Sequence, residues 1–220
     1  MTQDTVNQKT LKALLLNGSP HREKSTFTAL QQVRRGLEDG GIAAETVWLG
    51  DDAIKPCIGC GTCRSKGLNR CAYGDDDVVN TLIEAVERAD ALVIGSPVYY
   101  SGINGSLKSA LDRVFFAGGS SMAYKPAGAV VCARRAGTTA ALDQILKYFL
   151  ISQMPVVSSF YWTMVHGQNA KQVMQDAEGV QCAYHLGANM AWLLKSIEAG
   201  RAAGITPRIL EERAWTNFIR

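Results

Sequence analysis

Short apolar runs that alternate with helical patterns constrain the fold of this chain more than any other feature. Between the runs, apolar residues recur every three or four positions, which is the spacing of amphipathic helices. Strands joined by helical crossovers run parallel, and the helices then cover both faces of one sheet. We therefore predict an α/β fold with a doubly wound, five-stranded parallel sheet. The predicted strands are residues 11–16, 42–49, 91–95, 127–132 and 154–160.

Composition excludes several classes of protein. The chain has 220 residues, of which 47% are apolar and 20% charged, and this balance is typical of one ordinary globular domain. A net charge of +3 gives no reason to expect nucleic acid or a membrane as a partner. No apolar run approaches the roughly 18 residues that cross a bilayer, and the polar N-terminus lacks the core of a secretory signal. We expect a cytoplasmic protein.

No linker, repeat or low-complexity segment marks a second domain. We assign residues 1–200 to one domain that carries a cysteine-rich insertion at 55–74. The tail, residues 201–220, is rich in Arg and contains Trp215 and Phe218. It is either an arm that docks on a partner subunit or a frayed end.

The loops that follow the first, third and fourth strands should meet at one edge of the sheet, where open α/β folds bind ligands. The first loop, residues 17–26, offers hydroxyls, basic side chains and the backbone amides of a helix N-terminus, which are the groups that hold a phosphate. Its spacing is that of neither a Walker loop nor a dinucleotide-binding loop. The alternative is an ordinary capped helix start.

Two further loops carry groups that suit a flat aromatic ligand. In residues 96–108, Tyr99 and Tyr100 can shield one face of a ring, and Gly102 lets the backbone approach closely. In residues 132–139, Arg134 or Arg135 can face an electron-rich carbonyl or a phosphate. The alternatives are a loop with aromatic cover and a pair of solvated arginines.

The motifs G-S-P-x-x-x-x-S-T from Gly18 and S-P-V-Y-Y-x-G-x-N-G-x-L-K-x-x-x-D-R from Ser96 resemble those of the flavodoxin-like NAD(P)H-dependent FMN oxidoreductases. The branch that includes iron–sulfur flavoproteins is the most similar, and the match covers residues 11–160. The resemblance implies an FMN-binding domain with strand order 2-1-3-4-5, FMN at the switch point, NAD(P)H as electron donor, and a homodimer or homotetramer. Two residues depart from the family pattern, because His21 and Glu23 replace residues that are often basic or small.

The same resemblance assigns roles to individual residues. Four residues would hold the FMN phosphate: Ser19, Arg22, Ser25 and Thr26. Six would line the isoalloxazine ring: Pro97, Val98, Tyr99, Tyr100, Gly102 and Asn104. Two would close the third side of the flavin site: Arg134 and Gly137.

Four cysteines follow the spacing C-x2-C-x2-C-x7-C, and they are Cys57, Cys60, Cys63 and Cys71. Four thiolates so close together can bind one [4Fe–4S] cluster, because soft thiolates select iron–sulfur centres or zinc. The spacing resembles the compact motif of iron–sulfur flavoproteins, but related proteins carry similar loops without a metal. Cluster, zinc and free thiols therefore stay open. Cys132 and Cys182 lie in apolar surroundings and are predicted to fill the core.

We predict an FMN-dependent oxidoreductase that takes hydride from NAD(P)H and passes electrons to a small acceptor such as a quinone or a flavin. The alternative is an iron–sulfur electron carrier that a ferredoxin-like protein reduces. A third hypothesis is a redox-sensing interaction protein. His166 and His185 are candidate proton donors and Trp162 a candidate cover for the flavin, but flavin hydride chemistry requires no dedicated acid or base. The catalytic residue therefore stays unknown.

Overall fold

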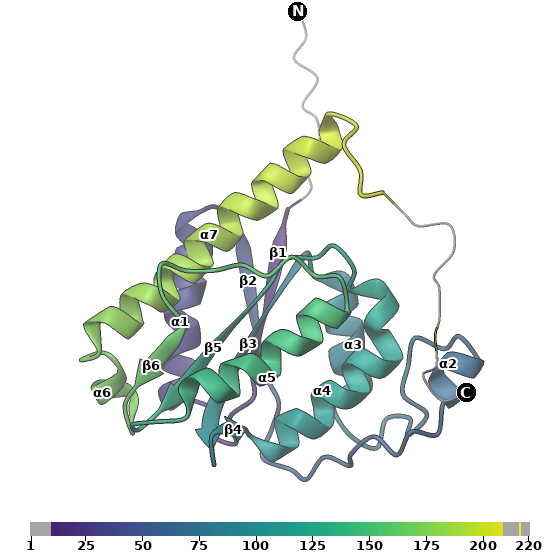
Figure 1. Cartoon of the computed structure of the whole chain (residues 1–220), viewed down its shortest axis with the longest axis horizontal. Coiled ribbons are helices and arrows are strands. Elements are labelled where there is room, and N and C mark those ends of the chain that lie inside the picture. The colour runs from purple at the N-terminus through teal and green to yellow at the C-terminus, as the bar shows by residue number, and fades with distance from the viewer. Residues whose placement is uncertain (1–9, 209–215, 217–220) are drawn as a thin grey trace, which may run out of the picture.

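A computed structural model describes residues 10–208 and residue 216 (Figure 1). Within these residues, one sheet of six strands has the order β2-β1-β3-β5-β6, with β4 paired to β3 outside this path. The strands are β1 Lys12–Asn17, β2 Ala43–Trp48, β3 Ala91–Tyr99, β4 Gly102–Ile103, β5 Ala127–Ala133 and β6 Met164–His166. The helices are α1 Ser25–Asp39, α2 Thr62–Ser65, α3 Val79–Arg88, α4 Gly105–Gly118, α5 Thr138–Ile151, α6 Ala170–Val173 and α7 Ala177–Ala202, with a 3-10 turn at Gly119–Ser121.

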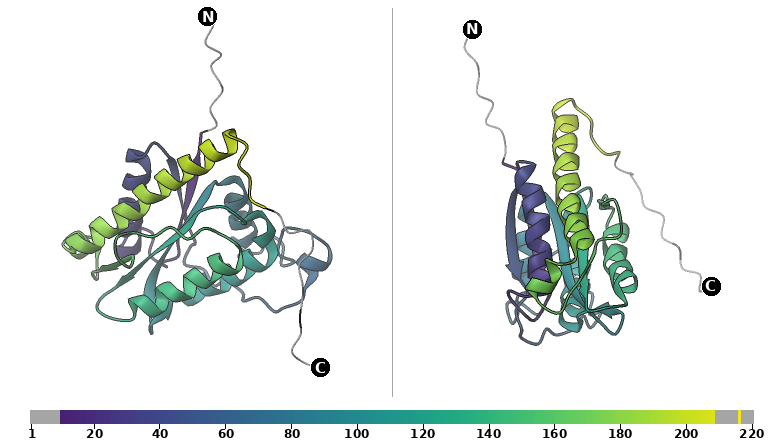
Figure 2. Two further views of the ribbon diagram at one scale, coloured as in Figure 1. Left: turned by 45° about the horizontal axis from the view of Figure 1, so that its top comes forward. Right: turned by 90° about the vertical axis from the view of Figure 1, so that its left-hand side faces the viewer.

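Helices cover both faces of the sheet (Figure 2). Helices α1 and α7 pack on one face, and α3, α4 and α5 pack on the other. Successive residues of β1 face opposite sides, so that Leu14 and Leu16 enter one core while Ala13 and Leu15 enter the other. Burial on both faces explains why β1, β3 and β5 are largely apolar, whereas β2, at the edge of the sheet, has no buried residue. The predicted α/β fold with a parallel sheet is confirmed.

The predicted fifth strand is wrong in position. Residues 154–160 form a single parallel bridge, between Val156 and Ala127, and the strand that pairs with β5 is β6. Pro155 accepts a hydrogen bond from the Ala127 amide through its carbonyl oxygen, but it has no N–H to donate. Pairing therefore does not extend before Val156. After it, the Val157 amide donates to the Ala127 carbonyl at 2.8 Å, and regular pairing with β5 begins only at Met164.

The prediction of five strands in the order 2-1-3-4-5 also needs correction. Residues 96–108 were expected to be a loop, but β3 continues to Tyr99 and turns back into the short antiparallel strand β4. The turn consists of Tyr100 and Ser101, whose φ angles are 49° and 60°. Two successive residues with positive φ form the tight turn that joins antiparallel strands. Among residues 10–208 the sheet therefore has six strands, and β4 shifts the numbers of those that follow.

No helix in the described ranges is long and apolar enough to span a membrane. The predictions for the C-terminal tail fall largely outside the described residues, and this includes both Trp215 and Phe218.

Candidate functional site

The loops after β1, β3 and β5 leave the sheet at its carboxyl edge, close to β4 in Figure 1. Asn17 at the end of β1 pairs in register with Gly95 of β3, and the Gly18 amide donates a 2.9 Å hydrogen bond to the Gly95 carbonyl. Farther along β3, Pro97 pairs with Cys132 of β5. The parallel register therefore places the three predicted ligand loops at one edge.

A buried asparagine shapes the first loop. Asn17 is fully buried, and its Oδ1 accepts a 3.1 Å hydrogen bond from the amide of Ser19. Its Nδ2 donates to the carbonyl oxygen of Arg22 at 2.9 Å. One side chain thus holds both ends of a tight turn, whose outer residues 21–24 are exposed to solvent. The exposed residues include His21 and Glu23, the two departures from the family pattern.

Helix α1 begins at Ser25, directly after this turn. The residue before it, Lys24, makes no side-chain cap, and the first amides of a helix lie at the positive end of its dipole. The Ser25 hydroxyl donates to the carbonyl oxygen of Gly167, 3.2 Å away at the end of β6. Thr26 is buried beneath the loop. The arrangement suits an anion at the start of α1.

Sequence reasoning missed Trp48, which supports the first loop from β2. The indole Nε1 of Trp48 donates a 2.8 Å hydrogen bond to the carbonyl oxygen of Ser19. The guanidinium of Arg22 lies over the same ring, 5.8 Å from its centroid. Its position in the sequence could have indicated this role, because Trp48 lies at the carboxyl end of the second strand, which pairs with the first.

The second loop presents aromatic side chains at the tip of the β3–β4 hairpin. Tyr99 is half exposed, and Tyr100 is fully exposed at 107% of its reference area. Pro97 and Val98 are partly buried below them. Asn104 is the N-cap of α4, because its Oδ1 accepts a hydrogen bond from the Leu107 amide. The tyrosine rings are the part of this loop that is open to a ligand.

The third loop touches the second at Gly137. This residue has a φ angle of +86°, and a Cβ there would lie 2.8 Å from the Cα of Ser101. Glycine is therefore required both for the backbone conformation and for the close approach. Arg134 and Arg135 are exposed, and the amide of Gly167 donates a 2.9 Å hydrogen bond to the carbonyl of Ala133. The predicted loops are thus in contact with each other and with the end of β6.

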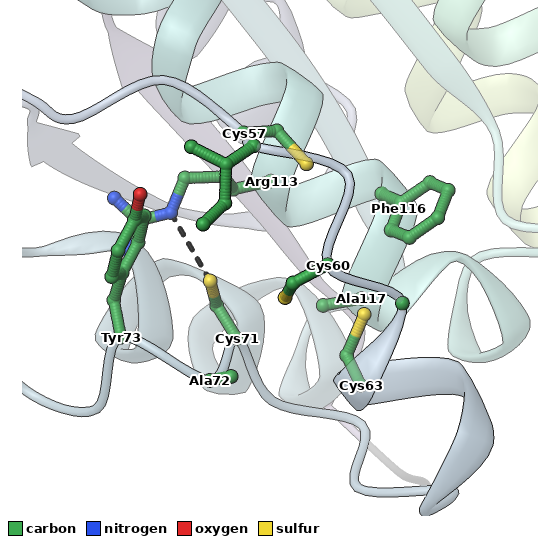
Figure 3. A pocket seen from close by; sticks show the side chains of 11 residues that line it. Cys57, Cys60, Cys63, Cys71, Ala72, Tyr73, Arg113, Phe116 and Ala117 are labelled. Atoms are coloured by element: carbon green, nitrogen blue, oxygen red, sulfur yellow. Dashed lines mark hydrogen bonds between the residues drawn. The ribbon is translucent and has the colours of Figure 1, made fainter.

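The four clustered cysteines line one cavity of about 200 Å³, which Figure 3 shows from close by. The loop before α2, α2 itself, the loop after it and α4 form its walls. Cys57 and Cys60 are exposed, Cys63 is buried, and Cys71 is intermediate. Within the described residues, no group of three or more His, Cys, Asp or Glu side chains is placed to hold a metal ion.

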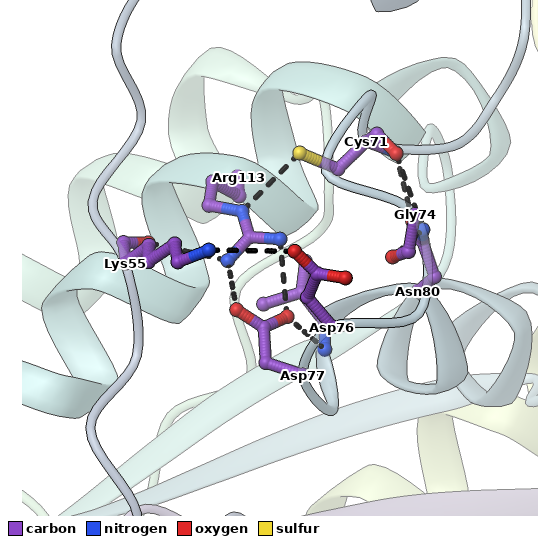
Figure 4. Close-up of polar contacts among 8 residues, drawn as sticks. Lys55, Cys71, Gly74, Asp76, Asp77, Asn80 and Arg113 are labelled. Carbon is purple, nitrogen blue, oxygen red and sulfur yellow. Dashed lines mark hydrogen bonds and ion pairs between the residues drawn. The ribbon is translucent and has the colours of Figure 1, made fainter.

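Arg113 on α4 lines one wall of this cavity (Figure 3), and Figure 4 shows its polar contacts. It is 1% exposed, and it forms an ion pair with Asp77. Its Nε donates a 3.2 Å hydrogen bond to the sulfur of Cys71. Burial lowers the pKa of Arg113, but the hydrogen bonds to Asp77 and Cys71 outweigh it and raise the pKa above the usual value. The guanidinium therefore stays charged.

The cysteines differ in their chemical environments. The exposed thiol of Cys60 has a lowered pKa, because the backbone and side chain of Thr62 donate hydrogen bonds to it. Cys132 and Cys182 are buried, which confirms the prediction that they fill the core. Burial raises the pKa of the Cys132 thiol to about 12. Of Cys60 and Cys132, the exposed thiol of Cys60, which lines the cavity, is therefore the more readily deprotonated.

Two histidines were candidate proton donors. His166 ends β6 at the carboxyl edge, and its Nδ1 lies 3.4 Å from Asp176 Oδ2. His185 lies on α7, where it packs against the ring of Phe160 at 5.3 Å. Of the two, only His166 is at the edge where the ligand loops meet. Trp162 is half exposed in the segment before β6.

Comparisons with known proteins agree with this arrangement. A family model described as NADPH-dependent FMN reductase matches residues 11–169. An iron–sulfur flavoprotein of Methanocaldococcus jannaschii is 30% identical over 196 residues, which are 86% of this chain and 100% of that protein. An iron–sulfur flavoprotein of Archaeoglobus fulgidus is 35% identical over 104 residues, which are 47% of this chain and 46% of that protein.

A solved structure of an NAD(P)H:quinone oxidoreductase from Methanothermobacter marburgensis has the same fold, with a TM-score of 0.62 and 18% identity. The superposition covers 83% of this chain and 98% of that one. Solved flavodoxin structures superpose as well. The flavodoxin-like character of the fold is thereby confirmed.

Proposed function

The chain belongs to the NADPH-dependent FMN reductase family, in the branch that includes iron–sulfur flavoproteins, and from this premise we propose that it is an FMN-dependent oxidoreductase that takes hydride from NAD(P)H. The electrons then pass to a small acceptor, such as a quinone or a flavin. The observation that carries the proposal is the meeting of three ligand loops at one sheet edge, where open α/β sheets bind cofactors.

The first loop and the start of α1 would hold the FMN phosphate. Lys24 makes no side-chain cap on α1, and the guanidinium of Arg22, 5.8 Å from the Trp48 ring centroid, adds a positive charge. Ser19 lies in this turn, and Ser25 and Thr26 are the first two residues of α1. A helix N-terminus together with a guanidinium is a favourable site for a phosphate dianion.

The hairpin and the third loop would surround the flavin ring. Tyr99 and Tyr100 are exposed aromatic side chains that can cover one ring face, with Pro97, Val98 and Gly102 beneath. Arg134 and the backbone at Gly137 would complete the third side. When bound, FMN supplies a hydride acceptor at N5. The protein residues bind it, orient it, and shield one face from water.

Anaerobic spectroscopy tests this proposal. Apoprotein mixed with FMN should become yellow, and NADH or NADPH should bleach the visible flavin bands. The proposal is wrong if the protein takes up no FMN, or if neither nicotinamide reduces the bound flavin.

A pair of variants tests the phosphate site separately. Arg22→Ala should weaken FMN binding roughly tenfold, since a hydrogen bond to a charged group is lost, but should leave riboflavin binding nearly unchanged. Arg35→Ala is the control: it also removes one positive charge, but on α1 beside Tyr184, and it should change the affinity for neither FMN nor riboflavin. Equal losses for FMN and riboflavin would contradict the assignment of Arg22.

We propose as the alternative an iron–sulfur electron carrier with a [4Fe–4S] cluster on Cys57, Cys60, Cys63 and Cys71. Two observations favour it: all four thiols line one cavity, and the Methanocaldococcus relative that the chain covers completely is named an iron–sulfur flavoprotein. The donor set fits in kind, because soft thiolates are the usual ligands of iron–sulfur centres. When bound, the cluster supplies one-electron transfer, and a ferredoxin-like protein would be the donor.

Iron and acid-labile sulfide, assayed after anaerobic purification, distinguish the two functions. A cluster requires about four of each per chain and broad visible absorption that Cys60→Ala removes. Cys182→Ala changes a buried cysteine outside the cavity and should retain the iron. A wild-type protein without iron and sulfide excludes this alternative and leaves the nicotinamide-dependent function intact.

We also propose that the protein is a homodimer or homotetramer. Large apolar side chains are exposed on the end of α5 and on the segment that follows it. They are Leu150, Ile151, Phe160, Tyr161 and Trp162. Exposed apolar surface of this kind favours association between subunits, and the molar mass in solution tests it.

A further inference from the structure

Arg113 is the last residue of the second flavin motif, yet it does not serve the flavin loops. Helix α4 starts at the hairpin and runs away from it, so Arg113 is eight residues into the helix, about 12 Å along its axis at 1.5 Å per residue. There its side chain enters the wall of the cysteine cavity. A buried arginine must be paired or hydrogen-bonded, because desolvation of an unpaired charge is costly.

All three nitrogens of the Arg113 guanidinium have partners. Nε donates to the sulfur of Cys71 at 3.2 Å, Nη1 donates to the carbonyl of Lys55 at 3.2 Å, and both terminal nitrogens bind Asp77. The ring of Tyr73 lies 4.7 Å from the guanidinium carbon. These contacts fix the plane of the guanidinium and aim one N–H at the cysteine sulfur.

Cys71 is held from its backbone as well. Its amide donates a 2.8 Å hydrogen bond to Asn80 Oδ1, and Asn80 Nδ2 donates to its carbonyl at 3.1 Å. Asn80 itself is fully buried on α3. By contrast, Cys57 and Cys60 are exposed on the outer part of the loop. Cys71 is thus a fixed corner of the cavity, tied to the two helices α3 and α4.

We propose that Arg113 is a positioning residue of the cysteine cavity, which holds the Cys71 sulfur and raises the reduction potential of the iron–sulfur cluster there. This inference rests on the iron–sulfur site proposed above. Reduction adds one negative charge, and hydrogen bonds to ligand sulfurs stabilise the more negative state. Asp77 neutralises most of the guanidinium charge, so the directed N–H···S bond should carry the effect.

Two variants should shift the potential in opposite directions. Arg113→Lys keeps the charge but loses the planar fork that binds sulfur and carboxylate together, so its potential should fall. Asp77→Asn removes the neutralising charge beside Arg113, so its potential should rise. We expect each shift to equal a change of roughly three- to tenfold in the equilibrium constant for reduction, where tenfold is about 59 mV for a one-electron couple.

Arg70→Lys is the matched control. Arg70 immediately precedes Cys71, but it binds Asp75 and Glu84 on the surface, so its substitution should leave the potential unchanged. The measurement is an anaerobic redox titration followed by visible absorption or electron paramagnetic resonance, together with iron and sulfide content. FMN binding shows that each variant is folded.

The outcomes separate this inference from the function on which it rests. Wild-type protein that acquires no iron after anaerobic reconstitution overturns both. Full iron content with an unshifted potential in Arg113→Lys overturns only the role of Arg113. An Arg113→Lys protein that binds FMN normally but loses iron supports the proposal that Arg113 positions the Cys71 sulfur. If Arg113→Lys does not fold, Asp77→Asn decides, and an unshifted or lower potential in that variant overturns the inference.

Discussion

The indole N–H of Trp48 donates a 2.8 Å hydrogen bond to the carbonyl oxygen of Ser19. This bond joins the carboxyl end of β2 to the loop that follows β1, across 29 residues of sequence. A carbonyl in a tight loop is thereby satisfied by a side chain and not by solvent. The bond adds to those of Asn17 in fixing the loop that is proposed to hold the phosphate.

We predict that Trp48→Phe weakens FMN binding about three- to tenfold, because it removes a hydrogen bond worth about 1 kcal/mol and leaves an aromatic ring for Arg22. Titration of apoprotein with FMN, followed by the quenching of flavin fluorescence, measures the affinity. Trp192→Phe changes an exposed tryptophan on α7 and serves as control. Equal affinities of Trp48→Phe and the wild type would show that the loop holds its shape without the bond.

Gly137→Ala tests the contact between the second and third loops. A Cβ there would lie 2.8 Å from Ser101 in a backbone conformation with φ of +86°. We expect a loss of about 1–3 kcal/mol in the free energy of unfolding, measured with urea, and weaker FMN binding. At Gly119 a Cβ meets nothing within 4 Å, so Gly119→Ala should be close to neutral. A stable Gly137→Ala protein with full FMN affinity contradicts the contact.

Tyr100 has an exposed ring and an unfavourable backbone conformation. Its φ of 49° is unfavourable for a residue with a side chain, so Tyr100→Gly should stabilise the apoprotein by up to about 1 kcal/mol. The same change should weaken FMN binding, because the ring no longer covers the flavin. Tyr124 has a φ of 66° but lies away from the ligand loops, so Tyr124→Gly should stabilise without affecting FMN. Equal FMN affinities of the two variants would contradict the proposal that the Tyr100 ring covers the flavin.

Stability at alkaline pH should depend on Cys132. Burial raises the pKa of its thiol from 9.0 to about 12, so above pH 9 the unfolded state releases a proton that the folded state keeps. The unfolded state then binds fewer protons, and the free energy of unfolding falls as pH rises from 9 to 12. At pH 10 the loss is about 1.4 kcal/mol.

The variant Cys132→Ala lacks this proton. Its stability deficit relative to the wild type, measured with urea, should be constant between pH 6 and 7.5 and should shrink by about 1.4 kcal/mol at pH 10. A deficit that stays the same at pH 10 would mean that the thiol titrates alike in both states.

Much of the fold follows from local patterns in the sequence. The first four predicted strands are present as β1, β2, β3 and β5. In β1, β3 and β5 the apolar runs bury both faces of a parallel strand, and β2 is the partly exposed edge strand. The fifth was misplaced, since residues 154–160 make only one bridge to β5. Apolar periodicity does not show which segment pairs with β5, and the strand that does, β6, has only three residues.

Local sequence patterns were enough to predict the layered α/β architecture, the three loops expected to bind a ligand and the grouping of four cysteines, because each depends on residues close together in the chain. The contacts of Trp48 with Ser19, of Gly137 with Ser101 and of Arg113 with Cys71 could be seen only in the folded protein. Arg113 and Cys71 are 42 residues apart, and no local pattern encodes such a contact. Strand register and helix packing bring these groups together, and both are set by burial of the whole core.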